Sequence, residues 1–93
     1  MNAGLRYVVG VTKQYFPTEY VTEVEKIDWE VVEDYLFSAY CAGKAFGFWV
    51  NEGKIYFDIV QETDSLEWAT STARRLGELA IWDSVEQKEI RIK

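Results

Sequence analysis

A chain of 93 residues, 48% hydrophobic and 16% aromatic, has the size and composition of one folded domain with a single core, and not of a disordered segment. Its formal net charge of −6, with no histidine and one cysteine, excludes an internal disulfide and argues against a basic nucleic-acid binder. Apolar runs are all shorter than the roughly 18 residues of a membrane helix, so we expect a soluble, cytoplasmic protein with no membrane partner.

The N-terminal part predicts two extended segments. Residues 1–6 lack the basic start and apolar stretch of a signal peptide. Leu5–Thr12 then alternates as a strand whose inward side carries Tyr7, Val9 and Val11. After a break at Lys13–Pro17, the β-branched residues of Thr18–Glu25 favour a short edge strand or an extended arm.

Asp28 is the expected N-cap of a helix that runs to about Ala42 and is closed by Gly43. A broad apolar stripe is expected to be buried and comprises Trp29, Val31, Val32, Tyr35, Leu36, Ala39, Tyr40 and Ala42. The opposite face carries Glu30, Glu33, Asp34, Phe37, Ser38 and Cys41. Phe37 among carboxylates has two interpretations: the Tyr15-Phe16 arm covers it, or it is the apolar anchor of an acidic protein-binding surface.

Ala45–Gln61 predicts a β-hairpin that turns at Asn51–Lys54, where Gly53 can adopt a positive φ. An even-length loop places one set of side chains on the face expected to form the core: Phe46, Phe48, Val50, Ile55, Phe57 and Ile59. The second face then holds Trp49 beside Tyr56, Gly47 beside Asp58, and Ala45 beside Val60. Either the arm from Tyr15 to Tyr20 or a second copy of the chain is expected to cover this second face.

Asp64 and Glu67 have the spacing of a capping box, which predicts a second helix from Ser65 to Leu76 with Gly77 as its C-cap. Leu79–Asp83 and Glu89–Ile92 are the expected closing strands. If Ile81 lies in the core, alternation places Trp82 on the second sheet face with Trp49, Tyr56 and Val60.

This order of elements predicts a single α+β domain over residues 1–93. We expect a two-layer sandwich in which two helices lie on one face of a mainly antiparallel sheet. The best topology for that order is a split β-α-β arrangement of the ferredoxin-like kind.

The residue inventory offers little catalytic chemistry. Without histidine and with Cys41 alone, no Cys-His or Ser-His pair and no ordinary zinc site can be assembled. Gly43 and Gly47 are followed by aromatic strand residues and not by a helix start, so there is no glycine-rich phosphate loop, and we expect no cofactor or metal. Asp58 is the one acid inside a strong strand and a candidate general base, although its expected position is the solvated margin of the sheet. We therefore expect a protein that is not an enzyme.

The negative charge is concentrated between Glu19 and Asp34, where seven acids accompany the single base Lys26, while the remaining acids and bases balance. Arg74 and Arg75 are the only adjacent bases and lie in the last helical turn, where the helix dipole favours them. Direct nucleic-acid binding is not expected, whereas an acidic surface suits a basic protein partner or imitates a nucleic acid.

The segment Ile55–Ile92 contains a strand that ends in Asp58, a helix, and a strand ending Ile81-Trp82-Asp83 before a closing hairpin. In this pattern it resembles short accessory proteins of unknown function carried by phages, plasmids and integron gene cassettes. The resemblance implies an origin in mobile DNA and gives no residue a role.

Three functional interpretations remain open. The first is an interaction module that forms a homodimer through an aromatic sheet face made of Trp49, Tyr56, Val60 and Trp82. The second is an acidic anti-defence inhibitor, of the anti-restriction or anti-CRISPR type, that occupies the nucleic-acid groove of a host enzyme. The third is a small-molecule binder with the aromatic face as a pocket wall. A mimic needs carboxylates spread over one exposed surface, whereas a dimer needs them kept off the aromatic patch.

Overall fold

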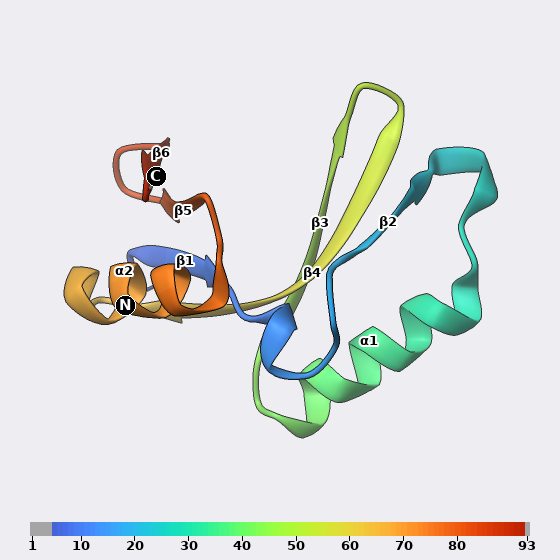
Figure 1. Cartoon of the computed structure of the whole chain (residues 1–93), viewed down its shortest axis with the longest axis horizontal. Coiled ribbons are helices and arrows are strands. Elements are labelled where there is room, and N and C mark those ends of the chain that lie inside the picture. The colour runs from blue at the N-terminus through green and yellow to red at the C-terminus, as the bar shows by residue number, and fades with distance from the viewer. Residues whose placement is uncertain (1–4, 93) are drawn as a thin grey trace. The chain divides into compact units, whose positions relative to one another are not determined.

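A computed structural model describes residues 5–92 and shows the α+β class that the sequence predicts (Figure 1). By their internal contacts, the described residues divide into two compact units. Among the described residues, the first unit contains 5–11 and 61–92, and the second contains Thr12–Val60. Residues 1–4, on which most of the signal-peptide prediction falls, lie outside the described range.

The described residues form two α-helices and a six-stranded sheet. The strands are β1 (Tyr7–Gly10), β2 (Tyr20–Glu23), β3 (Ala45–Asn51), β4 (Lys54–Thr63), β5 (Ala80–Asp83) and β6 (Lys88–Arg91). The helices are α1 (Trp29–Cys41) and α2 (Leu66–Leu76), with short 3₁₀ turns η1 (Thr12–Gln14) and η2 (Val24–Lys26). The strand order is β2-β4-β1-β5-β6, with β3 paired to β4, and it does not confirm the ferredoxin-like topology.

In the first unit, α2 packs against β1 and β5, and β6 pairs antiparallel with β5. Most of the buried side chains here are small or β-branched, which allows this close approach. The buried residues of this unit are Tyr7, Val9, Val11, Ala69, Thr72, Ala73, Ile81 and Asp83. The predicted strands in this part are thus confirmed within a residue or two of their ends.

The N-terminus of α2 differs from the predicted capping box. Ser65 is the N-cap, and its Oγ accepts a 3.0 Å hydrogen bond from the Trp68 amide. Asp64 instead accepts a 3.0 Å bond from the backbone amide of Arg6, far away in the sequence. The predicted C-cap is confirmed, since Gly77 adopts a φ of 74°.

In the second unit, β3 and β4 form the predicted hairpin with the predicted register, in which Phe48 lies opposite Phe57 and Trp49 opposite Tyr56. Glu52 and Gly53 form a two-residue loop with φ values of 54° and 81°. Positive φ at both central residues is the signature of the type I′ turn, whose twist matches that of the strands. Of the two alternatives predicted for Thr18–Glu25, an edge strand or an extended arm, the structure shows the strand, as β2, which pairs antiparallel with β4.

The core of the second unit lies between α1 and β4. Asp28 caps α1 by accepting a 3.1 Å bond from the Glu30 amide, as predicted. The buried cluster consists of Val32, Ile55 and Phe57, flanked by half-buried Tyr20, Ile27 and Phe46.

Two side chains expected in this core are solvent-exposed. Phe48 and Val50 of β3 point to the core face, as predicted, yet their side chains are 63% and 57% exposed. On β3 only Phe46 packs against the core cluster, whereas Ile55 and Phe57 of β4, which lie opposite Val50 and Phe48, belong to it. The core therefore covers β4 near the turn and leaves the side chains of the edge strand β3 exposed.

Candidate functional site

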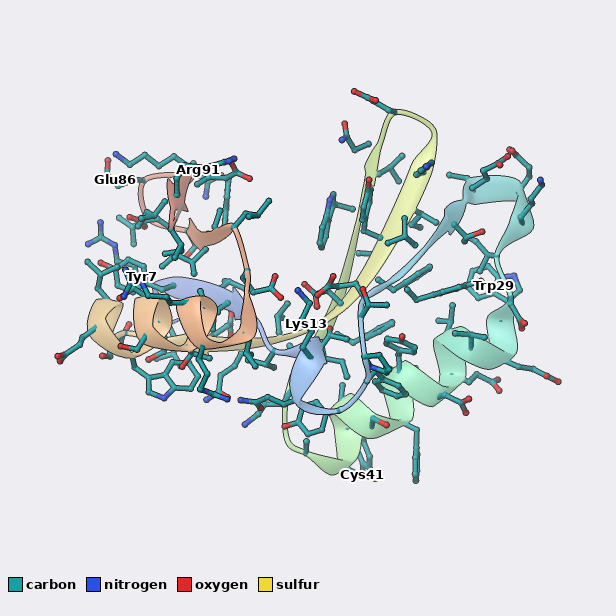
Figure 2. The ribbon with its side chains drawn as sticks, viewed as in Figure 1. Tyr7, Lys13, Trp29, Cys41, Glu86 and Arg91 are labelled. Carbon is teal, nitrogen blue, oxygen red and sulfur yellow. The ribbon has the colours of Figure 1, made fainter. Side chains whose placement is uncertain are left out.

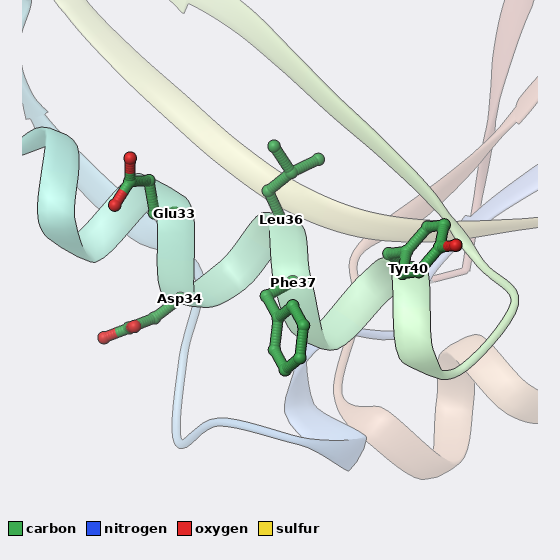
Figure 3. A pocket seen from close by; sticks show the side chains of 5 residues that line it. All are labelled: Glu33, Asp34, Leu36, Phe37 and Tyr40. Atoms are coloured by element: carbon green, nitrogen blue, oxygen red, sulfur yellow. The ribbon is translucent and has the colours of Figure 1, made fainter.

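The outer face of α1 exposes several large apolar side chains. Its side chains Trp29, Leu36, Phe37 and Tyr40 are between 50% and 80% exposed. Glu33, Asp34, Leu36, Phe37 and Tyr40 line a shallow hollow, and they project from successive turns of the helix (Figure 3). We call the set Trp29, Glu30, Glu33, Asp34, Leu36, Phe37 and Tyr40 the α1 outer face. It extends from Trp29, at the first turn, nearly to Cys41 at the last (Figure 2).

The sequence prediction for α1 was wrong at three positions. Trp29, Leu36 and Tyr40 were expected in the buried stripe, but they are exposed. The buried residues of the helix are Val32, Tyr35 and Ala39, which form one narrow row. The stripe is narrow because the core cluster below it is formed mainly by β4, so only one row of helix side chains meets a packing partner.

Phe37 has no aromatic cover from the preceding arm. Phe16 stacks instead on Tyr35, with ring centroids 3.9 Å apart and an interplanar angle of 8°. The Tyr35 hydroxyl donates a 2.8 Å hydrogen bond to the carbonyl of Thr18, which fixes the arm on that side of α1. The prediction that the arm covers Phe37 is therefore wrong, and Phe37 stays exposed with Glu33 and Asp34 beside it.

The second face of the hairpin carries the predicted aromatic pair. Trp49 and Tyr56 stack across the strands with centroids 5.2 Å apart and nearly parallel rings, and half-buried Val60 lies further along the same face of β4. Val21 of β2 lies opposite Tyr56 on its other side, a neighbour that the sequence pattern alone does not indicate. Trp82 belongs to the first unit, where it is exposed and Ile81 is buried, in the predicted alternation.

The arm does not cover this aromatic pair. Tyr20 stacks on Phe57, with centroids 5.9 Å apart, and therefore lies on the opposite face of the sheet. Trp49 remains 47% exposed. β3 contains no charged side chain, so this strand places no carboxylate on the aromatic face around Trp49.

Asp58 is buried, contrary to the expectation of a solvated position, with only 4% of its surface exposed. Its carboxylate accepts a hydrogen bond from the Thr12 hydroxyl, and that hydroxyl accepts a 2.6 Å bond from the Ile59 amide. Burial raises the pKa of Asp58 to about 6; the Thr12 bond opposes this rise, and the nearby Glu19 carboxylate adds to it. These contacts join η1 to β4.

Comparison with known proteins gives no family for this chain. No protein-family model matches it, and neither a curated protein nor a solved structure shows significant similarity. None of the helices in residues 5–92 is long and apolar enough to cross a membrane.

Proposed function

We propose that the protein is a non-enzymatic interaction module whose α1 outer face binds a basic, partly apolar segment of another protein. The observation that carries this proposal is the exposure of Trp29, Leu36, Phe37 and Tyr40 on a single helix face, next to acidic side chains. Large exposed apolar side chains with a polar rim are typical of protein-binding surfaces.

Charge complementarity indicates the chemistry of the partner. Glu33 lies among the apolar residues of this helix face, and Glu30 and Asp34 flank them on the side of Phe37. The helix itself contains no Lys or Arg. A partner segment with lysine or arginine next to leucine or phenylalanine would satisfy both parts of the surface. The apolar residues would supply affinity, and the charged rim would supply the association rate and selectivity.

Imitation of a nucleic acid is the second candidate function, favoured by the charge excess between Glu19 and Asp34. A mimic acts through its carboxylates, so its binding would fall steeply with added salt. The large apolar side chains between the acids of α1 favour the first candidate. Mobile-DNA origin and the absence of metal or nucleic-acid binding remain predictions.

The test is selection of peptides from a random display library with the wild-type protein. The selected sequences should be enriched in basic and large apolar residues. They should lose at least about tenfold in affinity for Phe37→Ser and for the double variant Glu33→Gln, Asp34→Asn. The matched control Val85→Ser changes an equally exposed apolar residue of the first unit and should bind like wild type.

Three results would count against the proposal. Selection could yield no enrichment, or the selected peptides could bind wild type and Phe37→Ser equally well. Alternatively, binding could vanish in high salt and depend on the carboxylates alone, which would support imitation of a nucleic acid instead.

A further inference from the structure

Strand β3 is an edge of the sheet, because within residues 5–92 it pairs with β4 alone. In a hairpin with a two-residue loop, the residues that flank the loop form a hydrogen-bonded pair, here Asn51 and Lys54. Alternation then directs the backbone N–H and C=O groups of Trp49 and Gly47 toward β4. The corresponding groups of Phe46, Phe48 and Val50 point to the open edge.

This edge lacks the features that usually prevent pairing with another chain. Its seven residues, AFGFWVN, contain no charged side chain and no proline. Natural edge strands are commonly short, charged, bulged or covered. An uncharged strand of this length is a ready template for an added strand.

Both faces of β3 expose large apolar side chains near the turn. Phe48 and Val50 are exposed on the face that carries the core, and Trp49 is exposed on the other face. A partner that lay flat on one face would leave the other uncovered. A strand added in the plane of the sheet brings its own side chains over both faces, because successive residues alternate.

We propose that β3 pairs antiparallel with β3 of a second copy of the chain, about a two-fold axis at Phe48. Phe48 is the midpoint of Ala45–Asn51, so this register pairs all seven residues. It joins Phe46 to Val50 of the second copy, and Phe48 to Phe48 of the second copy. All outward-facing N–H and C=O groups of the strand are then used.

Side-chain sizes favour this register over its neighbours. Trp49 lies directly opposite Gly47 of the second copy, where a side-chain carbon built on the glycine would meet nothing within 4 Å. The large indole thus has open space over the glycine on the face that also carries Tyr56. A two-fold axis at Trp49 would instead place Phe46 opposite Glu52 in the turn and leave fewer outward groups paired.

This interface is separate from the α1 outer face, so it does not depend on the proposed function. The first test measures mass in solution by sedimentation up to about 10⁻⁴ M, where we expect a dimer. Phe48→Pro removes an outward-facing N–H without removing a bond to β4, and edge strands tolerate proline at such positions. It should raise the dimer dissociation constant at least about tenfold more than Phe48→Ala, which keeps the N–H.

Cross-linking tests the register and does not depend on how well Phe48→Pro folds. In a Cys41→Ser background, which removes the native exposed thiol, Phe48→Cys would place two thiols opposite each other across the axis. Mild oxidation should give a disulfide-linked dimer. Asn51→Cys is the matched control, since its opposite residue in this register is Ala45 of the second copy.

Each result of the sedimentation and cross-linking experiments either supports or overturns the proposed β3 pairing. A dimer that cross-links through Phe48→Cys and is weakened by proline supports the pairing. A wild-type monomer at about 10⁻⁴ M overturns it. A dimer in which Asn51→Cys cross-links as fast as Phe48→Cys, or that proline leaves unchanged, overturns the β3 pairing and assigns association to another surface.

Discussion

Arg6 and Asp83 form a two-bond ion pair at the ends of the neighbouring strands β1 and β5. The Arg6 Nε donates to Asp83 Oδ1 at 3.0 Å, and Nη2 donates to Oδ2 at 2.9 Å. Asp83 Oδ1 also accepts from the backbone amides of Val85 and Glu86, at 3.0 and 3.1 Å. One carboxylate thus connects the start of β1 with the turn between β5 and β6.

This ion pair predicts a loss of stability in acid. Hydrogen bonds from Arg6 and from the turn amides lower the pKa of Asp83 to about 2. Because the unfolded pKa lies near 4, Asp83 contributes stability that is complete above about pH 4 and is lost as pH falls toward 2. Urea unfolding of wild type should show this loss. Asp83→Asn should be less stable at neutral pH and should show less change over the same range.

Arg6→Lys tests whether the two parallel hydrogen bonds of the ion pair contribute to stability beyond the charge. Lysine keeps the charge but cannot donate two parallel bonds, so its stability should lie between those of wild type and Arg6→Ala. Equal stability of Arg6→Lys and wild type at neutral pH would show that the two-bond geometry contributes nothing.

Asp58 predicts a pH dependence of the opposite sign at higher pH. Its folded-state pKa of about 6 exceeds the unfolded value, so the folded state binds the proton more tightly. The stabilisation from protonation is fully present below about pH 4 and is lost as pH rises through 6. Asp58→Asn resembles the protonated acid and should be more stable than wild type at neutral pH by about 1 to 3 kcal/mol.

The measurement is urea unfolding at about pH 4.5 and 7.5. The free energies of unfolding of wild type and Asp58→Asn should differ mainly at the higher pH. Asp34→Asn removes an exposed acid of the same unit, and it should follow the wild-type profile. If Asp58→Asn and wild type change in parallel between these pH values, the carboxyl does not titrate in this range.

The hairpin turn predicts stability changes of opposite sign at adjacent residues. Gly53 has a φ of 81°, and a side chain there would meet nothing within 4 Å, so Gly53→Ala carries only the backbone cost, about 1 kcal/mol of destabilisation. Glu52 has a φ of 54°, which asparagine adopts more easily, so Glu52→Asn should stabilise by a few tenths of a kcal/mol. Thermal unfolding of both variants checks this; a stabilising Gly53→Ala would contradict the type I′ turn.

Features that depend on near neighbours in the chain could be predicted from the amino-acid sequence. Side-chain alternation and the Glu52-Gly53 loop are local, and they were enough to predict the register of β3 on β4. Asp28 and Gly77 were recognised as caps for the same reason, since a cap bonds groups within one helical turn. Three of the residues expected in the aromatic sheet face, Trp49, Tyr56 and Val60, share a face because of that alternation alone.

Which apolar side chains become buried depends on contacts between residues that are far apart in the chain. Asp64 accepts a hydrogen bond from the backbone amide of Arg6 and therefore does not cap α2. Phe16 stacks on Tyr35 and leaves Phe37 exposed. Trp29, Leu36 and Tyr40 satisfy the helical period of a core stripe, but the layer beneath α1 is too narrow to bury them. Burial depends on the width of the packing surface that distant residues provide, and a helical or strand period carries no information about that width.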